Sequence, residues 1–253
     1  MIFRICVFTF CAVVANVALP QDAPTGDLKI KFVFKGDVPK PKPVKAANCG
    51  KVNLVDESLV VNLENKGIAN IFVYAYTGRG GAKFPVKLSD KTHTLANKDC
   101  RFEPHALLMR AGDKLKVTNP DPVGHNVNIP FFENTPVNIA VPSGGFVPVE
   151  GISKGEPSVT PVACNIHPWM KAQILVVDHP FAALSDKNGE LTIKNLPVGK
   201  KMVFRASHES GTFKNEIYVD GKKDKWKSNK FEVKIKEGMN DMGVVEVPAK
   251  EFK

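Results

Sequence analysis

The sequence predicts an all-β protein built from packed β-sandwiches. In almost every periodic segment apolar and polar residues alternate with a period of two, as in strands with one buried face. Gly, Pro, Asn and Asp, which favour turns, separate these segments. No segment reads as an amphipathic helix of about twelve residues or more. Strands of this length need a second sheet to bury their apolar faces, so sandwiches are the expected architecture.

Nine segments carry this strand pattern. In chain order they are residues 28–34, 59–63, 71–76, 115–118, 174–177, 191–193, 202–206, 231–235 and 244–247. They are rich in Val, Ile and Phe, which favour strands over helices. A length of 253 residues and an apolar fraction of 43% can supply two modest cores, so we expect two domains.

Residues 1–18 are typical of a secretory signal peptide. Arg4 is followed by an almost entirely apolar run over residues 5–15 and then by small residues. This run is too short to span a bilayer comfortably, although an uncleaved membrane anchor is the alternative interpretation. No later segment is apolar enough to cross a membrane. We therefore expect a periplasmic or secreted protein, with no stable membrane insertion after the signal is removed.

Cys164, His167 and Met170 follow one another at three-residue intervals. A thiolate and a thioether are soft ligands that favour copper, and imidazole binds copper in both oxidation states. A second imidazole is expected from His125, because a Gly-Asp turn and an alternating strand precede it and a strand end can deliver one fixed ligand. Met170 also fits a packing role, since Met in an apolar loop often fills gaps.

Two other interpretations of Cys164 are a buried structural thiol and half of a zinc site. Cys-x2-His is half of a zinc-finger pattern, but no second Cys-x2-Cys or His-x3-His accompanies it. The remaining histidines form no ligand group for type 2 or trinuclear copper; they are His93, His105, His179 and His208. The sequence also lacks a recognisable acid/base pair, a Gly-x-Ser-x-Gly motif and a phosphate-binding loop. We therefore do not expect an enzyme.

The stretch 102–119 resembles the cupredoxin family. It has an aromatic-x-Pro, a strand, Gly-Asp and a second strand that ends at Asn119, and the pair His125-Asn126 follows. The Cys-x2-His-x2-Met spacing is similar to that of the amicyanins within the family. The resemblance covers roughly residues 85–178, well under half of the chain.

This resemblance implies a Greek-key sandwich with one type 1 (blue) copper ion. Its ligands would be Cys164, His125 and His167 in the trigonal plane and Met170 in the axial position. Asn126 would tie the His-bearing strand to the Cys-bearing loop and so hold the ligand geometry.

The cysteine count is compatible with this ligand set. Without residues 1–18 the chain keeps Cys49, Cys100 and Cys164, an odd number, and export favours pairing. If Cys164 is the copper thiolate, Cys49 and Cys100 are left to form one disulfide. The alternative pairs Cys164 with one of the others and leaves a free thiol.

The segment from residue 181 onward resembles a different family, the carboxypeptidase regulatory-like β-sandwich. The resemblance lies in an Asp-x-x-Gly turn at 186–189 and a Leu-Pro-x-Gly turn at 196–199. Such a domain usually begins with a strand and a Pro-rich turn, as 27–84 does. We therefore expect 27–84 and 179–253 to form the second, smaller sandwich, with the cupredoxin domain at 85–178 inserted. In the alternative, the amino-terminal strands enlarge the cupredoxin sheet.

The formal net charge is +9, and about +8 without Arg4. A basic surface suggests acidic partners, although lysines on strand edges also discourage edge-to-edge pairing. No aromatic-basic pattern of a nucleic-acid-binding module is present. The expected function is transfer of single electrons between redox partner proteins by cycling Cu(II) and Cu(I). The alternatives are a copper-binding or copper-delivery protein and a non-redox structural or adhesive protein.

Overall fold

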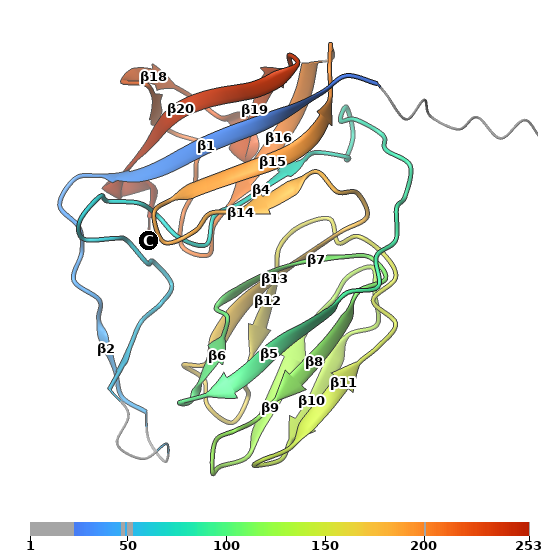
Figure 1. Cartoon of the computed structure of the whole chain (residues 1–253). Helices are drawn as coiled ribbons and strands as arrows, with labels where there is room; N and C mark the ends of the chain where they lie inside the picture. Colours follow the sequence, from blue (N-terminus) through green and yellow to red (C-terminus); the bar gives the residue numbers. More distant parts are fainter. Residues whose placement is uncertain (1–22, 47–48, 50–52, 200, 253) are drawn as a thin grey trace, which may run out of the picture.

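The computed structural model describes residues 23–46, 49, 53–199 and 201–252, and in this part of the chain the fold is all-β. The prediction of β-sandwiches is confirmed, because the strands form two pairs of facing sheets (Figure 1). The predicted signal peptide, residues 1–18, lies outside the described residues. Among the described residues, no helix has the length and apolar character needed to cross a bilayer.

The first sandwich takes its strands from both ends of the described chain. They are β1 (Thr25–Lys35), β4 (Phe72–Ala75), β14 (Ala182–Leu184), β15 (Glu190–Pro197), β16 (Lys201–Ser207), β17 (Ile217–Val219), β18 (Lys222–Asp224), β19 (Lys230–Lys234) and β20 (Gly238–Pro248). One sheet has the order β15-β1-β20-β17-β18 and the other β14-β4-β16-β19. β1 runs antiparallel to β15 and parallel to β20, so the amino-terminal strand belongs with the carboxyl-terminal ones.

The second sandwich lies between these strands in sequence. It consists of β5 (Thr92–Lys98), β6 (Arg101–Glu103), β7 (Ala106–Arg110), β8 (Lys114–Thr118), β9 (His125–Ile129), β10 (Val137–Val141), β11 (Phe146–Val149), β12 (Thr160–Ala163) and β13 (Lys171–Val177). Its sheets have the orders β10-β9-β12-β13-β7 and β11-β8-β5-β6. The remaining elements are a small hairpin of β2 (Pro43–Val44) and β3 (Leu54–Val55) and two 3-10 turns, η1 (Lys227–Asn229) and η2 (Ala249–Glu251).

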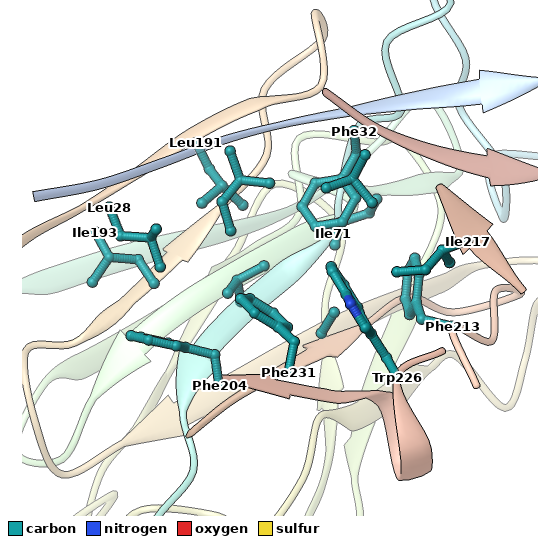
Figure 2. Close-up of a cluster of buried hydrophobic side chains, with 14 of the residues drawn as sticks. Leu28, Phe32, Ile71, Leu191, Ile193, Phe204, Phe213, Ile217, Trp226 and Phe231 are labelled. Atoms are coloured by element: carbon teal, nitrogen blue, oxygen red, sulfur yellow. The ribbon is translucent and has the colours of Figure 1, made fainter. Parts of the chain in front are cut away.

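The core of the first sandwich follows from the alternation of its strands. Every second residue of β1 from Gly26 to Phe34 is buried, and the side chains between them are only partly covered. In Figure 2, Leu28 and Phe32 on one sheet face Phe204 and Phe231 on the other, and Trp226 lies between Phe231 and Phe213. Trp226 is 1% exposed and stacks on Phe231 with the ring centroids 4.2 Å apart. Fully buried aromatic side chains of this size dominate the apolar area that a sandwich removes from water.

A third cluster joins the two sandwiches. Phe72 and Tyr74 of β4 pack against Ala106, Leu175 and Val177 of the second sandwich. All four residues of β4 are buried, and so are the last four of β13, because each strand is covered on both faces. A strand buried on both faces carries a continuous apolar run, which explains why neither sequence alternates strictly.

The predicted strand at residues 59–63 is wrong. This stretch makes only an isolated bridge between Val61 and Ile68, and the chain turns at Asn62. The Asn62 side-chain oxygen accepts hydrogen bonds from the amides of Glu64 and Asn65, at 2.9 and 3.4 Å. Asn side chains that bond the following backbone favour turns, and here that preference overrides the apolar alternation.

The connection between β1 and β4 reaches the second sandwich. Val44 and Leu54 of the β2–β3 hairpin pack into the core of the second sandwich. Cys49, within the same connection, forms a disulfide with Cys100. The hairpin is therefore held to the second sandwich by both apolar packing and a covalent bond.

We expect the double variant Cys49→Ser, Cys100→Ser to have a free energy of unfolding about 4 kcal/mol lower than the wild type. The bridge joins residues 51 positions apart and so restricts the unfolded chain, which is the chain-entropy account of disulfide stabilisation. Urea titration measures this difference. Reducing the wild-type disulfide with a mild thiol should give a similar loss. A loss well under about 1 kcal/mol in both experiments would contradict a stabilising role for the bridge.

His208 predicts a pH dependence of stability. Its pKa is lowered from 6.5 to about 4, mainly by burial and also by the neighbouring His105, while Glu209 and the Ala69 carbonyl act in the opposite sense. The unfolded chain therefore binds the proton first as the pH falls. The free energy of unfolding should drop through the window from about 6.5 to about 4, by roughly 3 kcal/mol at most.

Urea titrations at about pH 7 and about pH 4.5 on the wild type and His208→Gln measure this effect. The glutamine keeps a side-chain donor for the Ala69 carbonyl but does not titrate in this range. The loss of stability on acidification should be smaller in the variant. An equal loss in both proteins would assign the effect to other groups.

Candidate metal centre

His125, Cys164 and His167 meet at one end of the second sandwich. One donor atom from each of them lies within 4.8 Å of the other two. His125 is the first residue of β9, Cys164 directly follows β12, and His167 lies in the turn that leads to β13. The three residues are 1%, 1% and 5% exposed, so the donors are withdrawn from solvent.

The turn between β12 and β13 explains how Cys164 and His167, three residues apart, can serve as two candidate ligands. The Met170 amide donates to the His167 carbonyl at 2.9 Å, and the Cys164 amide donates to the Met170 carbonyl at 3.2 Å. These bonds close the turn directly above the Ala163–Lys171 pair of the antiparallel ladder. Cys164 and His167 therefore project from a fixed turn rather than from a free loop.

The distances between donor atoms suit one bound ion. His125 Nδ1 lies 2.9 Å from His167 Nδ1, and Cys164 Sγ lies 3.8 Å from the same His167 nitrogen. Metal–nitrogen and metal–sulfur bonds are about 2.0 and 2.3 Å long, so atoms this close can share a single cation. In a metal-free protein at least one of the facing nitrogens must carry a proton.

Asn126 joins the two segments that carry the ligands. Its side-chain oxygen accepts from the Asn165 amide at 2.7 Å, and its own amide points at Cys164 Sγ at 3.5 Å. Its side-chain nitrogen donates to Asn138 on β10 at 2.8 Å. The side chain is thus held on both sides and fixes the position of the sulfur relative to β9.

The ionisation of the cluster favours a thiolate. Burial opposes ionisation of Cys164, but hydrogen bonds from His125 and from nearby backbone amides outweigh it and lower the pKa of the thiol below its ordinary value. Burial likewise opposes protonation of His125, yet its bonds with Cys164 and Asp121 raise the pKa of the imidazole. Burial and the charge of His125 lower the pKa of His167. An ionised sulfur beside a neutral imidazole is the donor state that metals require.

Met170 is 1% exposed and belongs to the same apolar core as Cys164. Its backbone is fixed by the two hydrogen bonds of the turn. Its role as an axial ligand stays a prediction.

Trp169 packs on the candidate ligand His167. The two ring centroids are 5.2 Å apart, and the indole N–H donates to the Cys100 carbonyl at 3.1 Å. The indole is therefore committed to packing. Exposed apolar surface beside the site comes instead from Ile166 and Pro168, and Ile166 is 57% exposed.

Asp121 is the site residue that sequence reasoning missed. Its Oδ2 lies 2.9 Å from His125 Nε2, on the side of the ring opposite the facing nitrogens. The only sequence signal is an acidic residue four positions before a candidate ligand. A second group of possible ligand atoms joins Cys100, Asp121 and His125, but Cys100 is in the disulfide and offers no thiolate.

The other histidines lie elsewhere. His93 bonds Asp113 at 2.9 Å and His105 bonds Glu209 at 2.6 Å, while His179 and His208 are buried at separate places. In the described part of the chain none of these four belongs to a group of possible metal ligands.

Comparison with solved structures finds cupredoxins. A Cu-containing nitrite reductase from Thermus scotoductus SA-01 is 18% identical with a TM-score of 0.32, over 40% of this chain and 26% of that one, so the match spans about a quarter of that enzyme. A reduced mutant of amicyanin is 15% identical with a TM-score of 0.30, over 36% of this chain and 86% of that one. A purple cupredoxin from Nitrosopumilus maritimus is 20% identical with a TM-score of 0.27, over 34% of this chain and 99% of that one. No protein-family model and no curated protein matches the sequence.

Proposed function

We propose that the chain is an exported blue copper protein that carries single electrons between redox partner proteins. Cys164, His125 and His167 would hold one copper ion, with Met170 as a weak axial ligand. The observation that carries the proposal is the meeting of a thiol and two imidazole nitrogens within 4.8 Å in a buried site. When bound, copper would supply the Cu(II)/Cu(I) couple.

The donor chemistry favours copper over the common alternatives. A soft sulfur ligand with two imidazoles fits copper, whereas magnesium and calcium prefer oxygen ligands. Zinc accepts the same three donors, but structural zinc sites have four strong ligands. No fourth Cys or His ligand lies with these three among the described residues.

The chain's own residues make the site rigid. The closed turn from Cys164 to Met170 and the bonds of Asn126 hold the donors whether or not a metal is present. Rigid ligands suit electron transfer because few bonds then change when the oxidation state changes. Burial of all three donors also argues against copper delivery, which needs an open site.

The surface near the site is suited to an apolar contact. His167 is more exposed than the other two donors, and Ile166 and Pro168 surround it with exposed apolar atoms. Residues 85–178 contain nine basic and nine acidic side chains, so the excess charge of +9 lies in the rest of the chain. An acidic partner would be attracted over long range by the rest of the chain and would contact the second sandwich, whose residues 85–178 carry no net formal charge.

The proposal includes no enzymatic activity, and it places the protein in the periplasm or outside the cell. The disulfide between Cys49 and Cys100 supports an oxidising compartment. It also fits the assignment of Cys164 as the free thiol of the described chain.

Adding Cu(II) to the purified protein should produce an intense visible band from thiolate-to-copper charge transfer. Cys164→Ser should lose the band, because the hydroxyl is not ionised and is a poor electron donor to copper. Visible absorption during a copper titration measures this. A wild type that binds zinc or nothing, and gives no such band, would leave the structural or adhesive role in its place.

Met170→Leu should keep the band and raise the reduction potential. The leucine fills a similar volume, and loss of a weak axial donor favours copper(I). Redox titration followed at the band measures the shift. An unchanged potential and spectrum would assign Met170 to packing alone.

A further inference from the structure

Asp121 contacts His125 through the ring nitrogen that does not face His167. It is 7% exposed, and its Oδ2 lies 2.9 Å from Nε2 of His125, which is itself 1% exposed. An ionised carboxylate only accepts hydrogen bonds, so Nε2 must carry the proton. In the neutral ring the lone pair is then on Nδ1, the atom that faces His167.

The Asp121 carboxylate is itself fixed by two backbone amides. The Asp99 amide donates to Oδ1 at 2.7 Å, and the Cys100 amide donates to Oδ2 at 2.8 Å. The backbone of Asp121 is held as well, since its amide donates to the Asn119 side chain at 3.1 Å and its carbonyl accepts from the Ser143 hydroxyl at 2.7 Å. These bonds leave the carboxylate one position, next to the imidazole.

Asp99 and Cys100 adopt an unfavourable backbone to make these bonds. Their φ angles are 52° and 55°, in the left-handed region that non-glycine residues enter only at a cost in backbone energy. Two successive residues in this conformation direct both amides at one carboxylate. Cys100 is also anchored by the disulfide to Cys49 and by the indole of Trp169 on its carbonyl. Strain of this kind persists only where the surroundings enforce it.

We propose that Asp121 is the positioning residue of the metal centre and a determinant of its reduction potential. It holds the ring orientation and the Nε2 proton of His125, and its negative charge makes the imidazole a stronger donor. A stronger donor stabilises copper(II) more than copper(I), so Asp121 lowers the potential. The effect on potential rests on the proposed copper function, whereas the orientation of His125 does not.

The alternative is that Asp121 only stabilises the turn at residues 99–100. Asp113 separates the two explanations. It is a buried carboxylate in the same sandwich that makes the same kinds of bonds as Asp121, but to a histidine outside the metal site. It is 4% exposed, bonds His93 Nε2 at 2.9 Å and accepts backbone amides from Lys91 and Arg110 at 3.0 and 2.8 Å. A purely structural carboxylate should behave alike at both places.

Asp121→Asn and Asp113→Asn are therefore compared in the full chain. Hydrogen-bonded carboxylates behind a ligand histidine affect metal affinity 10- to 100-fold. If that loss falls on copper(II), the potential of Asp121→Asn should rise by about 59 to 118 mV, at about 59 mV per tenfold for one electron. Asp113→Asn should leave the potential unchanged, while both variants lose some stability. Equal potentials in all three proteins would overturn the proposal.

A second measurement needs no metal. In the metal-free wild type and in Asp113→Asn, the Nε2 proton of His125 should exchange slowly with solvent in NMR spectra. In Asp121→Asn it should exchange faster, because a neutral amide is a weaker acceptor. Unchanged exchange would refute the positioning role. If the wild type fails to bind copper yet shows this difference, the electron-transfer function fails while the positioning of His125 by Asp121 stands.

Discussion

The candidate metal centre depends on the register between β9 and β12. His125 lies 39 residues before Cys164, and the Asn128–Ala163 pair is what brings the start of β9 beside the Cys164 turn. Side chains in a strand alternate between the two faces, so a slip of one residue would turn His125 away from the sulfur. Asn126 of β9, whose side chain accepts a hydrogen bond from Asn165 in the turn after β12, opposes such a slip. The apolar residues that β9 buries fix the same register from the core side.

Burial of three ionisable side chains at this point carries a desolvation cost that the neighbouring polar groups offset. Each donor has polar partners. Cys164 accepts from the backbone amide of Asn126, His125 bonds Asp121, and His167 faces both His125 and Cys164. Such a network is stable only when its members are satisfied, because an unpaired buried group costs more than a bond contributes. The apolar core and the polar network therefore specify one arrangement together.

The parts that could be predicted from sequence are local. Strand-type alternation indicated an all-β fold, and the donor types at 164, 167 and 170 indicated a metal because three side chains on one short turn must lie close together. Asp121 could not be predicted, since its role depends on two amides about twenty residues away that point at it from left-handed residues. The turn at Asn62 was missed for a related reason: a side-chain bond to the backbone leaves no periodic signal. The packing of Trp169 likewise depends on a carbonyl distant in sequence.

The parallel pairing of β1 with β20 has a consequence for the order in which the chain can fold as it emerges, amino terminus first, in its final compartment. Gly26 of β1 pairs with Gly238 of β20, so this pairing can form only after almost the whole chain has emerged. All pairings of the second sandwich lie within residues 92–177 and can close much earlier. Long-range contacts form slowly and leave apolar strands exposed meanwhile. The second sandwich can therefore be complete while β1 and β4 are still unpartnered, and these two strands stay exposed until the strands after residue 181 have emerged.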